Sequence, residues 1–367
     1  MDIPLVDLKG QYNHLKSEID SAIHSVIEET AFIRGKFVEE FEKAYADKYV
    51  VKHCITCANG TDAIYITLRA LGIGSGDEVI TVANSWISTS ETISQAGAKP
   101  VFVDIEPDYF SIDPRKIEEK ITKRTKAIIP VHLYGQPAKI AEIRELCEEY
   151  QLLLIEDCAQ AHFARYNGQK VGTFGVAGTF SFYPGKNLGA YGDAGAIITN
   201  DDDLAIKSRM FANHGSLYKH DHEIEGINSR MDGIQAAILN VKLKYIDEWN
   251  NTRHKHALKY NELLSGFPNV KTPKIRENSF HIFHLYVIRT NKRNELENYL
   301  KSKSIGTGIH YPTALPFLPA YKHLAHKPYD FPIAHEYQDE ILSLPMFPEL
   351  SDDQIEYVVN SIKEFLK

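Results

Sequence analysis

Cysteine is one of the rarest residues in this chain, with 4 in 367 positions. So few cysteines cannot build the dense disulfide framework of a small secreted protein. Cys54 and Cys57 have the spacing of a metal-binding pair, but Cys147 and Cys158 are too far apart to supply a matching second pair. We therefore expect all four to be small buried side chains, and we predict no metal site.

An excess of positive charge is also missing, because the net charge is -8 and no block of basic residues occurs. We therefore expect neither nucleic acid nor an anionic membrane surface as a partner. The sequence contains no apolar run of about 18 residues, which is the length of a membrane span. Residues 1–5 have neither the cationic start nor the long apolar stretch of a secretion signal. These absences favour a cytoplasmic protein.

What the chain does have is a regular alternation of strand-like and helix-like segments. Strand-like apolar runs occupy residues 78–82, 100–103, 125–131, 151–156, 177–183 and 195–199. Helical spacing is found in residues 11–29, 37–48, 61–71, 86–96, 114–122 and 138–150. Strands that alternate with helices predict an α/β fold with a mainly parallel sheet.

The pattern changes near residue 245. A long helical stretch follows there, and residues 280–288 alternate as a strand with one solvated face. Helices are predicted over residues 292–304 and 351–366. We therefore divide the chain into a large domain, residues 1–245, with an N-terminal helical segment, and a smaller α+β domain, residues 246–367.

Two chemically distinctive residues follow predicted strands. Asp157 comes directly after the apolar run 151–156, and Lys186 follows the run 177–183. Ligands bind at the carboxyl ends of strands in open α/β sheets. An aldehyde cofactor with a pyridine ring needs a lysine for a Schiff base and a carboxylate that keeps the ring nitrogen protonated. The pair therefore predicts pyridoxal phosphate as the cofactor.

A candidate phosphate seat precedes the helix 61–71. Gly60 would let the backbone approach a ligand, and Thr61 lies where the first amide hydrogens of the helix are unpaired. Ser181 could add a hydroxyl to the same phosphate. An ordinary helix cap by Asn59 or Thr61 is the alternative. A Walker phosphate loop is excluded, because six residues separate Gly178 from Gly185 and Asn187 follows the lysine.

Three other residues could surround a cofactor ring. Trp86 begins the predicted helix 86–96 and could lie flat against the ring, or it could be an ordinary core tryptophan. Gln160 could donate a hydrogen bond to a phenolate oxygen of the cofactor. His162 could support Asp157.

Four ordered motifs carry a family resemblance. They are residues 60–63 (GTDA), 156–162 (EDCAQAH), 181–189 (SFYPGKNLG) and 226–232 (GINSRMD). Together they resemble the sugar aminotransferases of the DegT/DnrJ/EryC1/StrS family, and the similarity extends over nearly the whole chain. The resemblance implies an aspartate-aminotransferase-like enzyme of fold type I.

The resemblance also implies roles around the cofactor ring. Lys186 would form the Schiff base, Asp157 would pair with the pyridine nitrogen, and Gln160 would lie near the phenolic oxygen. Trp86 would stack on the ring. Some relatives have histidine in place of the lysine and are dehydratases, so Lys186 favours transamination.

At the phosphate, the resemblance implies a site shared by two subunits. Gly60, Thr61 and Ser181 would hold the phosphate from one subunit, and Asn228 would reach it from the other. A homodimer would then be a condition of activity.

The substrates implied by the resemblance are L-glutamate and a nucleotide-linked keto sugar. Residues 130–137, 213–216 and 219–226 are most similar to enzymes that act on dTDP-3-keto-6-deoxyhexoses. Tyr183, His310 and Tyr311 could contact the sugar, and Lys219 could meet the pyrophosphate. For His310, a structural role is equally open.

The sequence leaves several alternatives open. A C4 aminotransferase on a dTDP-, UDP- or GDP-sugar and an inosose aminotransferase are the rival enzymes. A catalytically silent relative that binds pyridoxal phosphate or a sugar for regulation is the rival from another class. The intact Lys186, Asp157 and Gln160 argue against the silent relative.

Overall fold

A computed structural model describes residues 1–366. A seven-stranded sheet forms its centre, in the order β1-β9-β8-β5-β4-β2-β3. These strands are β1 (His53–Cys57), β2 (Glu78–Val82), β3 (Lys99–Val103), β4 (Thr125–Ile129), β5 (Leu153–Asp157), β8 (Ala177–Ser181) and β9 (Gly195–Thr199). β9 runs in the opposite direction to the other six strands, so the predicted α/β fold with a mainly parallel sheet is confirmed.

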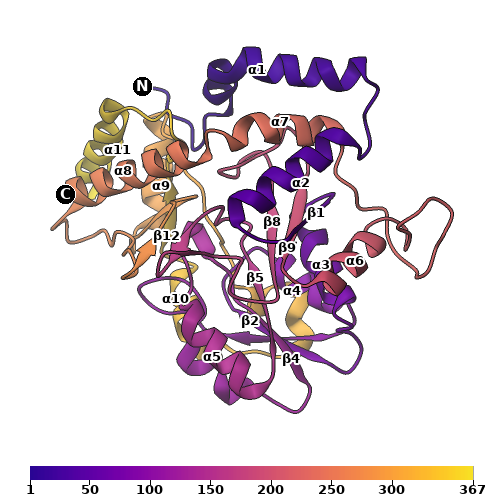
Figure 1. Cartoon of the computed structure of the whole chain (residues 1–367). Helices are drawn as coiled ribbons and strands as arrows, with labels where there is room; N and C mark the ends of the chain where they lie inside the picture. The colour runs from indigo at the N-terminus through magenta and orange to yellow at the C-terminus, as the bar shows by residue number, and fades with distance from the viewer. Residues whose placement is uncertain (367) are drawn as a thin grey trace.

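Helices cover both faces of this sheet (Figure 1). They are α1 (Leu8–Glu28), α2 (Lys36–Tyr49), α3 (Gly60–Ala70), α4 (Ser88–Gln95), α5 (Ile140–Tyr150), α6 (Asp202–Phe211) and α7 (Gly233–Leu243). Side chains alternate along each strand. Cys54 and Ile198 accordingly pack with α1, α2 and α7, whereas Ile55 and Ile197 pack with α3 and α6. The core therefore has a layer on each side of the sheet.

The C-terminal part of the chain forms a second group of elements, at the left of Figure 1. It contains α8 (Ile246–Leu264), β11 (Tyr286–Arg289), α9 (Arg293–Ser302), α10 (Pro332–Tyr337), β12 (Ile341–Leu344) and α11 (Asp352–Leu366). A separate core joins α8, α9 and α11 to the antiparallel pair β11–β12. Ile3 belongs to this core too, while Ala314 and Phe331 pack against the large sheet region. The division at residue 245 stays a prediction.

Two predicted elements differ from the structure. Residues 114–122 form two short 3₁₀ turns, Pro114–Lys116 and Glu118–Lys120, instead of one helix. In this segment Ile117 is the apolar side chain that is fully buried, so a continuous helix would gain little burial. Residues 280–288 do not form one strand, because Phe283 has a φ of 44° that interrupts the extended backbone. Only β10 (Ser279–Phe280) and β11 remain extended.

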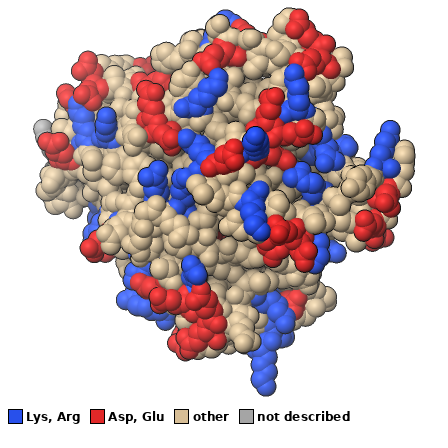
Figure 2. Space-filling model, in the orientation of Figure 1, with Lys and Arg blue, Asp and Glu red and all other residues tan. Residues whose placement is uncertain are grey.

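The surface carries charges of both signs. Figure 2 shows Lys and Arg interspersed with Asp and Glu on the face that it presents. In the described part of the chain, no helix combines the length and apolar character needed to cross a membrane.

The four cysteines are free and buried, as expected from their number. Cys158 lies close to His132 and Glu156 in the described region. Glu156 already accepts hydrogen bonds from the backbone N–H groups of Gly172, Phe174 and Gly175 at 2.7–2.9 Å and contacts His132 Nε2 at 3.0 Å. The carboxylate therefore anchors the loop 172–175.

Candidate active site

A cavity of about 520 Å³ opens at the carboxyl ends of the parallel strands. Ten of the predicted site residues line it: Gly60, Thr61, Trp86, Asp157, Gln160, Ser181, Tyr183, Lys186, His310 and Tyr311. They come from five separate segments of the chain. The fold therefore brings these predicted residues into one cavity.

Asp157 is the last residue of β5, and its side chain is almost completely buried. The Thr89 hydroxyl donates to Asp157 Oδ2 at 2.8 Å, and the backbone N–H of Ala159 donates to Oδ1 at 3.1 Å. Burial raises the pKa of Asp157, while these two donors and the nearby Lys186 oppose the rise. A carboxylate buried in this way is stabilised by a cationic partner, such as a protonated pyridine nitrogen.

Lys186 lies in the turn that follows β8, where its backbone N–H donates to the carbonyl of Tyr183 at 2.8 Å. Burial lowers the pKa of the Lys186 amine to about 8, although the Asp157 carboxylate opposes this shift. The amine is therefore neutral in a large fraction of molecules at mildly alkaline pH. A neutral amine can attack an aldehyde or accept a proton, and an ammonium group cannot.

The start of α3 forms the predicted phosphate seat. Asn59 caps the helix, because its side chain accepts a hydrogen bond from the backbone N–H of Asp62 at 2.8 Å. Thr61 Oγ1 contacts Ser88 Oγ at 2.7 Å. A Cβ atom on Gly60 would lie only 2.5 Å from the Cβ of Ser181, so glycine permits this close approach. Free helix amides and several hydroxyls converge here, which suits a phosphate group.

Gln160 and Tyr311 line the cavity and are joined by a hydrogen bond. The backbone N–H of Tyr134 donates to Gln160 Oε1 at 2.6 Å, and Gln160 Nε2 donates to the Tyr311 hydroxyl at 3.1 Å. The Trp86 ring lies 5.5 Å from the Tyr311 ring, and 58% of Trp86 is exposed. Trp86 is therefore not a core tryptophan. It also precedes α4, which begins at Ser88, so the prediction that Trp86 opens the helix was wrong.

His162 does not support Asp157, contrary to the sequence-based expectation. Its Nε2 contacts the carbonyl of Ser181 at 2.9 Å, and its Nδ1 contacts the Tyr45 hydroxyl at 2.9 Å. A carbonyl only accepts, so Nε2 carries the hydrogen and Nδ1 accepts from Tyr45. Burial lowers the pKa of His162 to about 3, which keeps the ring neutral. His162 thus holds the end of β8, and Thr89 supports Asp157.

Sequence reasoning missed three residues near the cavity: Thr89, Asn187 and His284. Thr89 belongs to a hydroxyl-rich stretch at residues 88–90, and this composition was a usable signal. Asn187 follows Lys186 directly, and its side chain contacts His284 Nδ1 at 3.2 Å. His284 was placed in a predicted strand with a solvated face, but it is buried and lines the cavity.

Lys219 and Asn228 do not line this cavity. Both are exposed in the segment between α6 and α7, which extends at the right of Figure 1. Asn228 pairs with Asn213 through a backbone bridge at the base of this segment. Within one chain, these two residues are therefore separate from the predicted cofactor pocket.

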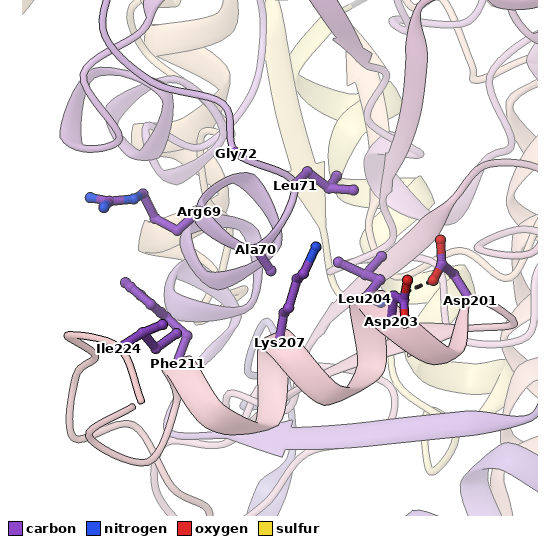
Figure 3. A pocket seen from close by; sticks show the side chains of 10 residues that line it. All are labelled: Arg69, Ala70, Leu71, Gly72, Asp201, Asp203, Leu204, Lys207, Phe211 and Ile224. Carbon is purple, nitrogen blue, oxygen red and sulfur yellow. Dashed lines mark hydrogen bonds between the residues drawn. The ribbon is translucent and has the colours of Figure 1, made fainter. Parts of the chain in front are cut away.

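A second hollow of about 500 Å³ lies between the end of α3 and α6 (Figure 3). Arg69 and Lys207 bring positive charge to it, and Asp201 and Asp203 bring negative charge. Asp201 also caps α6 by accepting a hydrogen bond from the backbone N–H of Leu204 at 2.9 Å. None of the predicted site residues lines this hollow.

The α/β sheet, the cavity that holds Lys186 and the buried Asp157, and the helix-start phosphate seat define a pyridoxal-phosphate enzyme of fold type I. Residues 13–363 match the DegT/DnrJ/EryC1/StrS aminotransferase family. The chain belongs to this family of pyridoxal-phosphate-dependent sugar aminotransferases, which confirms the predicted family, enzyme class and cofactor.

Similar proteins of known description cover nearly the whole chain. A protein from Aneurinibacillus thermoaerophilus, described as dTDP-3-amino-3,6-dideoxy-alpha-D-galactopyranose transaminase, is 43% identical over 99% of each chain. A "Pleiotropic regulatory protein" from Geobacillus stearothermophilus is 48% identical over 100% of this chain and 99% of its own. The crystal structure of DesV from S. venezuelae in complex with a ketimine intermediate has a TM-score of 0.98 and 40% identity, and covers 100% of this chain and 99% of that chain.

The substrates of the relatives differ in their nucleotides. A relative from Acidithiobacillus ferrooxidans, 41% identical over 99% of this chain and 98% of its own, is described as a UDP-N-acetyl-3-dehydro-alpha-D-glucosamine 3-aminotransferase. A GDP-perosamine synthase from Vibrio cholerae also matches, at 36% identity over 90% of this chain and 91% of its own. The relatives thus include nucleotide-sugar aminotransferases for dTDP-, UDP- and GDP-linked sugars.

Proposed function

We propose that this aminotransferase moves the amino group of L-glutamate to C3 of a dTDP-3-keto-6-deoxyhexose and produces a dTDP-3-amino-3,6-dideoxyhexose. The observation that carries an aminotransferase reaction is that the half-buried Lys186 and the buried Asp157 line one cavity with the phosphate seat of α3. The choice of C3 and dTDP is supported by the dTDP-3-amino-sugar transaminase from A. thermoaerophilus.

Pyridoxal phosphate, when bound, supplies the aldehyde that carries the amino group and the ring that stabilises negative charge on carbon. Lys186 would hold the cofactor through a Schiff base. As a free neutral amine, Lys186 Nζ would remove the α-proton of the amino donor and return a proton to the sugar carbon. Its lowered pKa of about 8 suits this work, because the amine must exchange a proton in both directions.

The other residues of the cavity bind and orient. Asp157, held in place by Thr89, would pair with the ring nitrogen of the cofactor. Gln160 would hold the phenolic oxygen, and Trp86 would stack on the ring. Tyr311, which accepts a hydrogen bond from Gln160, would contact the sugar.

Tyr183 and His310, which both line the cavity, would contact the sugar. Tyr183 is more than half exposed at its mouth. His310 Nδ1 contacts Ser343 Oγ at 2.8 Å, so this ring is held by a side chain of β12. Burial lowers the pKa of His310 to about 4, and a neutral ring can hydrogen-bond a sugar hydroxyl without attracting the phosphates.

The active enzyme is a homodimer in this proposal. Gly60, Thr61 and Ser181 bind the cofactor phosphate from one subunit, while the partner contributes the exposed segment between α6 and α7. Asn228 of that segment would reach the phosphate, and Lys219 would meet the pyrophosphate of the sugar nucleotide. The exposure of both residues in the single chain agrees with a role across the subunit boundary. We place the enzyme in the cytoplasm, in agreement with its four free cysteines.

The test is a panel of keto-sugar nucleotides incubated with purified enzyme and glutamate. We expect turnover with a dTDP-3-keto-6-deoxyhexose and a new C–N bond at C3, located by NMR. A bond at C4 would show a C4 aminotransferase, and preferential turnover of a UDP- or GDP-sugar would overturn the proposed nucleotide. An inosose as the only acceptor would overturn the nucleotide-sugar assignment.

A regulatory function is the second candidate, and the name of the G. stearothermophilus relative favours it. In that case the chain would bind pyridoxal phosphate without transferring amino groups. The two candidates differ in one absorbance scan. The visible band of the bound cofactor bleaches on addition of glutamate if the chain is an active aminotransferase, and it persists with every amino donor if the chain is silent.

A further inference from the structure

Tyr134 bonds to two parts of the chain that line the cavity, although it does not line the cavity itself. Its backbone N–H donates to Gln160 Oε1 at 2.6 Å, and its hydroxyl donates to the backbone carbonyl of His310. Its own carbonyl accepts from the backbone N–H of Leu285 at 3.3 Å. One buried residue thus joins the loop after β5 to two segments of the C-terminal part of the chain.

The backbone of Tyr134 is uncommon for a residue with a side chain. Its φ of 59° lies in the left-handed region, and Gly135 follows at a φ of 95°. A Cβ atom on Gly135 would lie 2.8 Å from Ile282 Cγ1 and 2.9 Å from the backbone nitrogen of His284, so the turn packs tightly against that segment. Such residues persist where the surrounding contacts fix them, and they cluster at ligand sites. The backbone therefore points to a functional constraint at Tyr134.

The N–H of Tyr134 decides how Gln160 is oriented. A backbone N–H can only donate, so the Gln160 atom that faces it is the amide oxygen. The amide nitrogen therefore faces Tyr311 and donates to its hydroxyl at 3.1 Å. Because this hydroxyl accepts from Gln160, its own hydrogen is left to donate to a ligand in the cavity that Tyr311 lines.

The hydroxyl of Tyr134 holds the backbone next to Tyr311. A carbonyl only accepts, so the Tyr134 hydroxyl is the donor to His310. The ring of His310 is held separately, by Ser343 Oγ. The Tyr134 ring packs edge-on against Phe110, with 5.4 Å between the ring centroids. Removal of the hydroxyl alone would therefore release the His310 carbonyl and keep the ring contact.

We propose that Tyr134 is a positioning residue for the acceptor sugar. Its hydroxyl fixes the backbone at His310, and its N–H fixes Gln160, which bonds to Tyr311. The inference rests on the proposed function, in which His310 and Tyr311 contact the sugar. Asp157 is held by other donors, Thr89 and the backbone of Ala159. Loss of the Tyr134 hydroxyl should therefore affect the reaction with the sugar more than the reaction with the amino donor.

The first test compares two acceptors in Tyr134→Phe. The enzyme is treated with glutamate, the excess is removed, and either 2-oxoglutarate or a dTDP-3-keto-6-deoxyhexose is added at a concentration below saturation. The return of the visible absorbance gives the rate with each acceptor. We expect the reaction with the sugar to be about five- to tenfold slower, the effect of one lost hydrogen bond. The rate with 2-oxoglutarate should change by less than about twofold, because the variant keeps the N–H that orients Gln160.

Tyr260→Phe is the matched control. The Tyr260 hydroxyl also donates to a buried carbonyl, that of Pro345, at 3.1 Å, but it lies in the core of α8, α9 and α11. Each variant loses one hydrogen bond, so the two should lose similar thermal stability. Only Tyr134→Phe should change the ratio of the two acceptor rates. Equal slowing with both acceptors in Tyr134→Phe, or the same change of ratio in Tyr260→Phe, would overturn the inference.

The second test measures binding to the cofactor-free protein by calorimetry. The probe is dTDP-glucose, a sugar nucleotide without the keto group. We expect Tyr134→Phe to bind it about five- to tenfold more weakly than the unmodified protein, and Tyr260→Phe to bind it equally well. Equal affinity in Tyr134→Phe and the unmodified protein would contradict the proposed role of Tyr134.

The proposed function fails in a different way. If the visible band of the unmodified enzyme persists with glutamate, the proposed function is overturned, and this inference with it. If the unmodified enzyme reacts with glutamate but accepts or binds only UDP- or GDP-linked sugars, the proposed nucleotide is wrong. The same comparisons of Tyr134→Phe with Tyr260→Phe, made with that sugar, then decide the role of Tyr134.

Discussion

Asp157, Gln160 and Lys186, which line the cavity, are called its floor here. This floor can be compared with the segment between α6 and α7, because the sequence assigns functional residues to both. On the floor, Asp157 and Gln160 are buried and each makes hydrogen bonds to other parts of the same chain. In the segment, Lys219 and Asn228 are exposed and lie outside the cavity. From this difference we infer that one chain orients the reacting groups, while the proposed phosphate contacts of the segment require a second chain.

The comparison predicts large effects of substitutions on the floor and smaller effects in the segment. Floor substitutions should change chemistry at every protein concentration. Segment substitutions should change binding, and their effect should depend on dimer formation.

The largest effect is expected for Lys186→Ala. Turnover should fall by on the order of 10⁴-fold or more, because the amine both attaches the cofactor and transfers protons. Steady-state assays with glutamate and the keto sugar measure this loss, and circular dichroism should show an unchanged fold. Normal turnover in this variant would refute the assignment of Lys186.

Asp157→Asn should lower kcat by about 10²- to 10³-fold, because a neutral amide cannot hold the ring nitrogen in its protonated form. The absorbance change with glutamate under single-turnover conditions measures the reaction with the amino donor directly. Thr89→Val is the matched control. It removes one hydrogen bond at 2.8 Å but retains the carboxylate, so its effect should be smaller. If Asp157→Asn reacts at a rate close to that of the unmodified enzyme, Asp157 does not pair with the ring nitrogen of the cofactor.

Asn228→Asp should weaken pyridoxal phosphate binding by about tenfold, since it adds a negative charge beside the phosphate. Titration of the cofactor-free protein with pyridoxal phosphate gives the dissociation constant. Asn228→Leu removes the amide without adding charge and should have a weaker effect. If Asn228→Asp binds the cofactor normally, the proposed contact across the subunit boundary is wrong.

Lys219→Ala should have the smallest effect, an increase of about two- to fivefold in KM for the sugar nucleotide with kcat unchanged, because exposed ion pairs are weak. The increase should diminish at high salt. Lys207→Ala removes another exposed lysine, one that lines the second hollow, and should leave KM unchanged (Figure 3). Equal changes in both variants would indicate a general charge effect instead of a contact.

The main features of the fold could be predicted because its signals are local. Apolar runs of strand length and helices with regular spacing produce the α/β order directly, and a lysine or aspartate after such a run lies at the sheet edge. The prediction of a helix at residues 114–122 was wrong. The segment has few apolar residues, so a continuous helix would add little buried apolar surface beyond that of the two short turns. The strand expected at residues 280–288 failed because Phe283 turns the backbone.

The supporting contacts of the site were less predictable. His162 lies five residues after Asp157 and was expected to support it, but its ring points to Ser181 and Tyr45. Thr89 is 68 positions from Asp157 and performs that role. Short distance along the chain therefore did not indicate contact, because a strand end and the turn after it point their side chains in different directions.

By itself, the sequence determined which residues can do the chemistry and the order in which strands present them. Apolar periodicity, a glycine before a helix, and the identities of Lys186 and Asp157 are properties of short segments. Which groups bond to which depended on the tertiary structure, including the hydrogen position on His162. That choice depends on carbonyl groups of distant segments, which accept hydrogen bonds and never donate them, and only folding brings these carbonyls beside the side chains that they orient.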